Sequence, residues 1–161
     1  MKHKYVKELM TSPAITCEES TSIKEAIHIL KEKNIGFLPI TKKGIIIGVA
    51  TDRDILIRGI GIYKLNSKIN KVMTSGDIHF VNPDTTLQDA AKIMADYKVR
   101  RLVVLDDGKV IGVLTSKNLL CEPELLPFIH ETYLSSKTIP EYSMYLNSNP
   151  HDSIKTSDFP L

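Results

Sequence analysis

The sequence predicts an α/β fold built from two similar halves, and three observations lead to this prediction. The chain has 161 residues, of which 42% are hydrophobic and 25% are charged, as in ordinary globular proteins. A pattern of residues recurs once along the chain. Within each copy, apolar residues at helical spacing alternate with short β-branched runs. At roughly 100–200 residues per domain, we expect one compact unit made of two repeats.

The internal repeat sets the expected boundaries. Leu-Met-Thr-Ser at residues 9–12 returns as Val-Met-Thr-Ser at residues 72–75. An ungapped offset of 64 residues then relates Ser22 to Thr86 and Ile55 to Leu119. We therefore expect a first repeat over residues 6–60, a linker over 61–68, a second repeat over 69–121 and a C-terminal extension over 122–161.

Each repeat is expected to run strand, helix, strand, strand, helix. Ser22-x-x-Glu25 and Thr86-x-x-Asp89 are capping boxes, which predict the start of the first helix. Two apolar runs joined by a glycine turn then predict a β-hairpin. The runs are 37–40 and 45–50 in the first repeat, and 102–105 and 110–114 in the second. A second short helix is expected to open at Thr51 and at Thr115.

A half of this size buries too little surface to be stable alone. We expect the two repeats to pack on each other about a pseudo-twofold axis, because each carries an apolar helix face and apolar strands. Such packing leaves a cleft between equivalent loops. A duplicated fold should therefore have two equivalent clefts.

The segment from Gly48 to Asp54 is the first candidate binding site. It leads from a strand into a helix, so the Thr51 hydroxyl and free backbone N–H groups form an anion site at the helix start. Asp54 can accept paired hydrogen bonds from a ribose diol, and Gly48 would let a ligand approach the backbone. The alternative is purely structural, because Thr51-x-x-Asp54 is also a capping box that needs no ligand.

The second repeat departs from this pattern. Thr115 is retained, but Asn118 stands where the first repeat has Asp54. An amide lacks the charge to hold a diol strongly. We therefore expect one good site and a second, weaker or empty site at Thr115 and Asn118.

The tandem pattern resembles a pair of cystathionine β-synthase (CBS) domains, known as a Bateman module. The likeness covers roughly residues 6–120 and rests on two full copies in the right order. Its motifs are Met10-Thr11 and Met73-Thr74 at the repeat starts, residues 34–40 and 99–105 around the second strands, and the Gly-x-x-Thr-x-x-Asp signature of Gly48–Asp54.

The resemblance implies a nucleotide site and roles for its residues. Asp54 would take the ribose hydroxyls, and Thr51 would help to hold phosphate. Arg100 and Arg101 of the opposite repeat would reach the phosphates, because a planar guanidinium suits bidentate contact. The alternative for this pair is two solvated charges at a strand start. The implied adenine slot is lined by Ile15, Thr16, Ile35, Gly36 and Phe37.

The resemblance further implies a non-catalytic regulatory module. It would bind AMP, ADP, ATP or S-adenosylmethionine as a regulatory ligand and need no cofactor. It would form a homodimer and signal to a regulated protein on another chain by a conformational change. The alternative is a ligand-free scaffold or interaction protein. A nucleotide-processing enzyme would need an activated nucleophile or a metal-binding carboxylate cluster, and we see neither in the sequence.

Composition excludes several further classes. The net charge of +2 predicts no strong attraction to nucleic acid or to anionic membranes. No apolar stretch is long enough to span a bilayer, and the charged start has no signal-peptide core. The two cysteines and five histidines show no metal-ligand spacing, so we expect no metal site. A reduced cytoplasm is the expected location.

The C-terminal extension carries less information. Residues 122–134 are expected to form a short helix, in which Pro127 fits only in the first turn. Residues 135–161 are expected to be a strap packed on the module or on a second subunit. The alternative is a docking segment for a partner.

Overall fold

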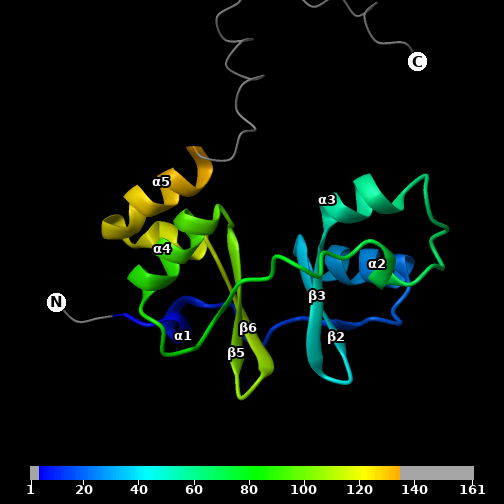
Figure 1. The fold of residues 1–161 in the computed structure, drawn as a ribbon, viewed down its shortest axis with the longest axis horizontal. Helices are drawn as coiled ribbons and strands as arrows, with labels where there is room; N and C mark the ends of the chain where they lie inside the picture. Colours follow the sequence, from blue (N-terminus) through cyan, green and yellow to red (C-terminus); the bar gives the residue numbers. More distant parts are fainter. Residues whose placement is uncertain (1–3, 135–161) are drawn as a thin grey trace, which may run out of the picture.

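The computed structural model describes residues 4–134 and confirms the α/β fold of two repeats. Each repeat holds one three-stranded sheet, in the order β1-β2-β3 or β4-β5-β6. The two sheets lie side by side in the middle of the molecule, and the helices lie on the outer sides (Figure 1).

The elements of the first repeat follow the expected order. They are β1 (Cys17–Glu18), α2 (Ile23–Lys33), β2 (Phe37–Lys42), β3 (Ile45–Thr51), α3 (Asp52–Asp54) and a π-helical turn over Ile55–Gly59. Strands β2 and β3 form the expected antiparallel hairpin, with an irregularity between Ile40 and Thr41. Strand β1 pairs with β2 in parallel.

The second repeat matches the first up to the end of its hairpin. Its elements are β4 (Phe80–Val81), α4 (Leu87–Tyr97), β5 (Arg101–Asp106), β6 (Lys109–Thr115) and a 3-10 turn over Asn118–Cys121. The short helix expected after Thr115 is present as this 3-10 helix, which begins at Asn118. Pro123 disfavours the helical conformation at Glu122, which ends the turn.

The long helices start and stop as their sequences predict. The Ser22 hydroxyl accepts a hydrogen bond from the Glu25 backbone at 3.1 Å, and the Glu25 carboxylate accepts one from the Ser22 backbone at 2.9 Å. Thr86 accepts from the Asp89 backbone at 3.1 Å at the start of α4. Asn34 and Lys98 end the helices in the left-handed conformation, with φ of 50° and 58°.

The repeats exchange their opening segments. Helix α1 (Val6–Leu9) opens the first repeat in sequence, yet Val6 is fully buried in the core of the second. Thr11 pairs with Val113 of β6. In the same way Thr74, which follows a 3-10 turn over Ile69–Lys71, pairs with Val49 of β3. Each repeat is thus completed by the segment that precedes the other.

Two cores result from this exchange, one for each sheet. The first is built on α2, β2 and β3 and includes Ile69 and Val72. The second is built on α4, β5 and β6 and includes Val6 together with Leu125 and Ile129 from beyond the second repeat. A separate repeat would therefore lack part of its own core.

Helix α5 (Leu126–Leu134) covers the outer side of α4 and forms within the segment expected to be helical (Figure 1). It follows a short 3-10 turn over Pro123–Leu125, and Pro127 lies in its first turn as expected. Ala91 and Ala95 are buried on α4, whereas Ile27 and the exposed Lys31 take the equivalent places on α2. Small side chains let α5 approach α4 closely. The expected strap over residues 135–161 lies outside the described residues.

Among residues 4–134, no helix combines the length and the apolar character needed to cross a bilayer.

Candidate functional site

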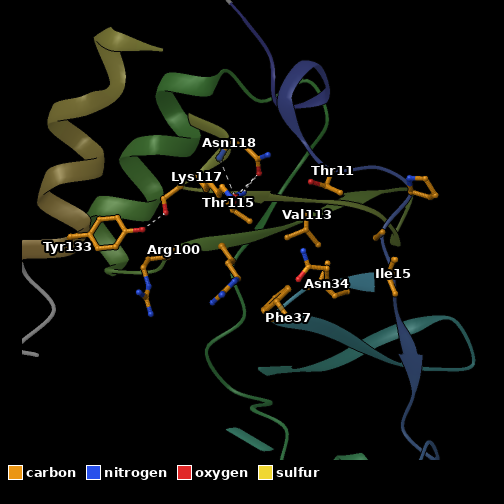
Figure 2. A pocket seen from close by; sticks show the side chains of 16 residues that line it. Thr11, Ile15, Asn34, Phe37, Arg100, Val113, Thr115, Lys117, Asn118 and Tyr133 are labelled. Atoms are coloured by element: carbon orange, nitrogen blue, oxygen red, sulfur yellow. Dashed lines mark hydrogen bonds between the residues drawn. The ribbon is translucent and has the colours of Figure 1, made fainter. Parts of the chain in front are cut away.

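A cavity of about 610 Å³ lies between the two repeats and is the candidate ligand site. Its walls come from the exchanged segment after Thr11, the stretch 34–37 before β2, the start of β5, the end of β6 and helix α5. Figure 2 shows these side chains around one space. The volume lies within the usual range for small-molecule pockets.

The two ends of this cavity differ in chemistry. Ile15, Phe37 and Val113 lie towards one end, and Arg100, Lys117 and Tyr133 lie towards the other (Figure 2). An apolar end suits a flat ring system, and a cationic end suits a phosphate. The arrangement fits an elongated ligand with one apolar and one anionic part.

The structure groups the predicted residues differently from the sequence analysis. Of the implied adenine slot, Ile15, Ile35, Gly36 and Phe37 line the cavity. Residues Thr115 and Asn118 of the second repeat share it with them, whereas Thr51 and Asp54 of the first repeat do not line it. The structure therefore does not bring that slot and the first signature motif to one cavity.

The exchange of opening segments explains this crossed arrangement. The chain that follows Thr11 is held against β6, so it runs past the end of the second repeat's hairpin. The cavity thus combines the Thr-x-x-Asn motif of the second repeat with the opening segment of the first. The repeat pattern in the sequence does not predict this crossed arrangement, because it assigns each opening segment to the repeat that follows it.

Thr16 lies elsewhere. It lines a separate cavity beside the two hairpin turns, with Lys43 and Asp107. The family resemblance implies a place for Thr16 in the adenine slot, because the first strand of the repeat lines that slot in the family. The structure does not bring it to the cavity that Ile15 lines.

The cleft on the side of the first signature motif is smaller. A cavity of about 240 Å³ is lined by Asp77, His79, Lys98 and Val49, with Arg100 and Arg101 shared between the two cavities. It is the pseudo-symmetric counterpart of the larger cavity. The two clefts are therefore unequal, but the larger one belongs to the Asn118 motif and not to Asp54.

Asp54 is held by the protein itself. Its Oδ2 accepts hydrogen bonds from the Thr51 backbone at 2.9 Å and from the Thr51 hydroxyl at 2.8 Å. Its Oδ1 pairs with Arg58 at 3.0 Å. The capping box that the sequence offered as the structural alternative is present. A ribose diol at this carboxylate would have to share acceptors that are already used.

The cap formed by Thr115 and Asn118 has the same hydrogen-bond geometry as the cap formed by Thr51 and Asp54, but Asn118 carries no charge. Asn118 Oδ1 accepts from the Thr115 backbone at 2.8 Å and from its hydroxyl at 2.7 Å. The Nδ2 amino group of Asn118 is then the atom that can donate to a ligand. The dashed lines in Figure 2 show this cap at the wall of the cavity.

Two guanidinium groups stand between the clefts. The Arg100 guanidinium lies over the ring of Tyr133 at 5.7 Å, and that of Arg101 over the ring of Phe37 at 5.5 Å. Burial lowers the pKa of Arg101, and the neighbouring charge of Arg100 lowers it further. Concentrating positive charge in a partly buried place is unfavourable for the free protein and favours an anionic ligand.

Several residues of the cavity were not predicted, among them Ser116, Lys117 and Tyr133. Ser116 and Lys117 lie inside the Thr115–Asn118 motif, of which only the first and last positions were expected to contact a ligand. Tyr133 lies outside both repeats, on α5. No signal in the repeat pattern could have placed Tyr133, because its position depends on how α5 packs against α4.

The described residues contain no group of three or more His, Cys, Asp or Glu side chains that could hold a metal ion. Cys17 is buried, and burial raises the pKa of its thiol to about 11. Cys121 is exposed. Neither lines the large cavity.

The similarity of the chain to known proteins agrees with this architecture. The CBS domain profile matches residues 6–60 and 69–123. The CBS domain-containing protein YhcV of Bacillus subtilis is 30% identical over 114 residues, which cover 71% of this chain and 81% of that protein. The uncharacterised protein YlbB of the same organism is 32% identical, over 71% of this chain and 78% of that protein.

An enzyme relative is matched only in part. Inosine-5'-monophosphate dehydrogenase of Korarchaeum cryptofilum is 32% identical over 72% of this chain, but over 24% of the enzyme. Its likeness to this chain is therefore confined to a minor part of its length.

Solved structures share the fold. The CBS domain pair of protein MJ0100, in complex with 5'-methylthioadenosine and S-adenosyl-L-methionine, has a TM-score of 0.65 at 29% identity and covers 73% of this chain and 94% of that one. The CBS domain structure of NE2398 has a TM-score of 0.66 at 27% identity, over 74% of this chain and 97% of that one. With both repeats matched and the segments exchanged as described, this chain belongs to the CBS domain family and carries two copies of the domain in tandem.

Proposed function

We propose that this chain is a non-catalytic regulatory module that binds an adenosyl ligand in the 610 Å³ cavity between its repeats. The candidates are AMP, ADP, ATP and S-adenosylmethionine. The observation that carries the proposal is the cavity itself, with apolar walls at one end and cations at the other. The adenosyl ligands bound by the CBS pair of MJ0100 support the same ligand class.

Each part of the ligand has a matching part of the cavity. The adenine ring would lie between Ile15, Phe37 and Val113. The Nδ2 group of Asn118 would donate to a ribose oxygen. A phosphate or other anionic end would be held by Arg100 and Lys117, with Arg101 close by. A second ligand at Thr51 and Asp54 would be bound more weakly, in the smaller cleft.

A ligand in this cavity contacts both repeats at once. It would therefore bind most tightly to one relative arrangement of the two sheets and shift the population towards it. A partner protein, or a second copy of the chain in a homodimer, would respond to that arrangement. We expect the protein to act in the cytoplasm. We do not expect it to bind nucleic acid or membranes.

One observation favours a different function. The Thr51–Asp54 cap is complete without a ligand, and Leu56, Ile57 and Ile60 beside it are exposed apolar side chains. A ligand-free scaffold that uses this apolar surface for assembly is the second candidate.

Thermal unfolding with AMP, ADP, ATP, S-adenosylmethionine and NAD separates the two functions. Ligand at about 100 times its Kd stabilises a protein by roughly 2.7 kcal/mol. For a chain of this size that raises the Tm by about 5–10 °C. The sensor predicts such a rise with at least one adenosyl ligand. No rise with any of them would favour the scaffold.

The matched variants are Asn118→Ala and Asp54→Ala. Each removes the side chain that closes an equivalent cap, so both lower the Tm of the free protein. If the large cavity is the main site, only Asn118→Ala reduces the rise caused by the ligand. A rise that disappears in Asp54→Ala alone would move the site to the smaller cleft.

A further inference from the structure

Tyr133 is the part of the cavity wall that the two repeats do not supply. It belongs to α5, beyond residues 69–123 matched by the second domain profile. Figure 2 shows its ring at the cationic end of the cavity, beside Arg100 and Lys117. A residue at this place can affect how the anionic part of a ligand is held.

Three contacts join Tyr133, Arg100 and Ser116 in a closed cluster. The Arg100 guanidinium lies 5.7 Å from the centre of the Tyr133 ring. The Tyr133 hydroxyl and the Ser116 hydroxyl share a hydrogen bond at 3.0 Å. The Ser116 backbone N–H donates to the Arg100 carbonyl at 2.9 Å. Ser116 itself is buried, so it anchors the phenol end firmly.

This cluster fixes the orientation of a long, flexible cation. A guanidinium can stack through its face and donate hydrogen bonds through its edge at the same time. The Tyr133 ring stacks on the face of the Arg100 guanidinium, so the N–H groups at the edge of the guanidinium can still donate to a phosphate. Ring and phosphate therefore do not compete for Arg100. The ring instead removes part of the side-chain entropy that a phosphate would otherwise have to overcome.

The first repeat has no equivalent of this cluster. Gly36 stands at the position of Arg100, and Asp52 at the position of Ser116, with its carboxylate 3.0 Å from where a Cβ of Gly36 would lie. A carboxylate there repels a phosphate. The cluster is thus specific to the larger cavity.

We propose that Tyr133 is a positioning residue that orients Arg100 for an anionic ligand and couples occupancy of the cavity to the docking of α5. This inference rests on the proposed function, since it assigns the regulated element of the same site. Coupling is reciprocal: a ligand that holds Arg100 in place stabilises α5 on α4 by as much as docked α5 strengthens binding.

Affinity measurements on Tyr133 variants test the positioning role. Calorimetry with AMP and with uncharged adenosine on wild type, Tyr133→Phe and Tyr133→Leu gives the comparison. Tyr133→Leu should weaken AMP binding about two- to five-fold, as expected for loss of an exposed cation–π contact, and leave adenosine binding unchanged. Tyr133→Phe keeps the ring but loses the hydrogen bond to Ser116, so it should weaken AMP binding less than Tyr133→Leu does. Equal weakening for both ligands would overturn the proposal, because it would show a general structural effect.

The matched control is Tyr63→Leu. Tyr63 is 38% exposed, against 41% for Tyr133, and it also lies beside a cation, with Lys71 at 5.1 Å from its ring. Tyr63 lines none of the cavities described above. Its variant should bind both ligands like wild type. A matching loss of AMP affinity in this control would count against the specific role of Tyr133.

Hydrogen exchange tests the coupling to α5. AMP should slow amide exchange in residues 126–134 of wild type, and this protection should shrink in Tyr133→Leu. If wild type binds AMP but α5 exchange is unchanged, the coupling is refuted and the proposed function stands. If wild type binds neither AMP nor adenosine, the proposed function fails, and the inference fails with it.

Discussion

Met73 packs directly over Gly48 of strand β3, so that a Cβ on Gly48 would lie 2.5 Å from the Met73 sulfur. The same relationship joins Met10 to Gly112 of β6, at 2.6 Å. Gly48 was expected to let a ligand approach the backbone. The Met73 side chain of the exchanged segment instead fills the space beside Gly48.

These glycines should therefore be essential for packing. Gly48→Ala and Gly112→Ala force the methionine and its backbone to move, and each should cost about 1–3 kcal/mol of unfolding free energy. For a chain of this size we expect the Tm to fall by roughly 2–4 °C for each kcal/mol. Gly76→Ala is the control, since nothing lies within 4 Å of a Cβ there. Equal stability of all three variants would contradict this packing.

The cap at Asp54 should depend on an oxygen acceptor more than on charge. Asp54→Ala removes the acceptor for two Thr51 hydrogen bonds and should cost about 1–2 kcal/mol. Asp54→Asn keeps one acceptor, as Asn118 does in the second repeat, and loses only the ion pair with Arg58. That pair should contribute about 0.3–0.5 kcal/mol.

Urea unfolding of these two variants measures the difference. Arg58→Gln serves as the control, because it removes the same ion pair from the other side. Arg58 also donates a hydrogen bond to the Thr74 hydroxyl at 3.1 Å, so this variant should lose at least as much stability as Asp54→Asn. An Asn variant as unstable as the Ala variant would show that the charge, not the cap, is the stabilising part.

Introducing a carboxylate at Asn118 should strengthen nucleoside binding in the large cavity. Asn118→Asp keeps the oxygen that accepts from Thr115, so stability should change by no more than about 0.5 kcal/mol. Hydrogen bonds to a charged acceptor exceed neutral ones by about 1 kcal/mol, which predicts roughly five-fold tighter binding of adenosine. AMP should gain less, since its phosphate is repelled by the new charge. Calorimetry with both ligands checks this, and weaker adenosine binding would contradict the prediction and show that the ribose accepts a hydrogen bond from the Asn118 amide.

The two cysteines should differ sharply in reactivity. Cys121 is exposed, whereas Cys17 is 7% exposed and has its pKa raised by burial to about 11. A thiol-reactive disulfide reagent should modify Cys121 within minutes at neutral pH and Cys17 only on unfolding. Mass spectrometry of the modified peptides separates the two. Fast modification of Cys17 in the folded protein would contradict its burial.

The same pKa shift gives a pH dependence with a definite sign. The folded state favours the neutral Cys17 thiol, whose ordinary pKa is 9.0. The stabilisation is therefore complete below pH 9.0 and decreases as the pH rises towards about 11. Cys17→Ala should show a smaller loss of stability over this range than wild type.

Local sequence patterns were sufficient to predict most of the fold. Ser22 and Thr86 marked helix starts because a capping box acts over three residues, and the hairpins followed from two apolar runs joined by the turns at Gly44 and Gly108. The path of the opening segments was not predictable in this way. The contact of Thr11 with Val113 is set by packing between distant parts of the chain, which no local pattern records.

The sequence predicted which residues line the candidate site better than it predicted which of them share one cavity. Ile15, Ile35, Phe37, Arg100 and Arg101 were all named from the sequence and lie on one cavity. The sequence grouped these residues with Thr51 and Asp54, whereas in the structure they share the cavity with Thr115 and Asn118. The reason is that the opening segment of the first repeat packs on the second repeat. Tyr133 was not predicted, because its place depends on how α5 packs against α4.

The exchanged opening segments also bear on how such a molecule can be assembled. In a chain with a single repeat, the opening segment would have to pack on a second molecule. The formation of a complete core would then depend on the protein concentration. Because the two repeats are covalently linked here, each opening segment packs on the other repeat within one molecule. The effective concentration of such a segment is on the order of millimolar. Because each half is closed by a piece of the other, cutting the chain in the linker should yield two fragments that are incomplete alone and complementary together.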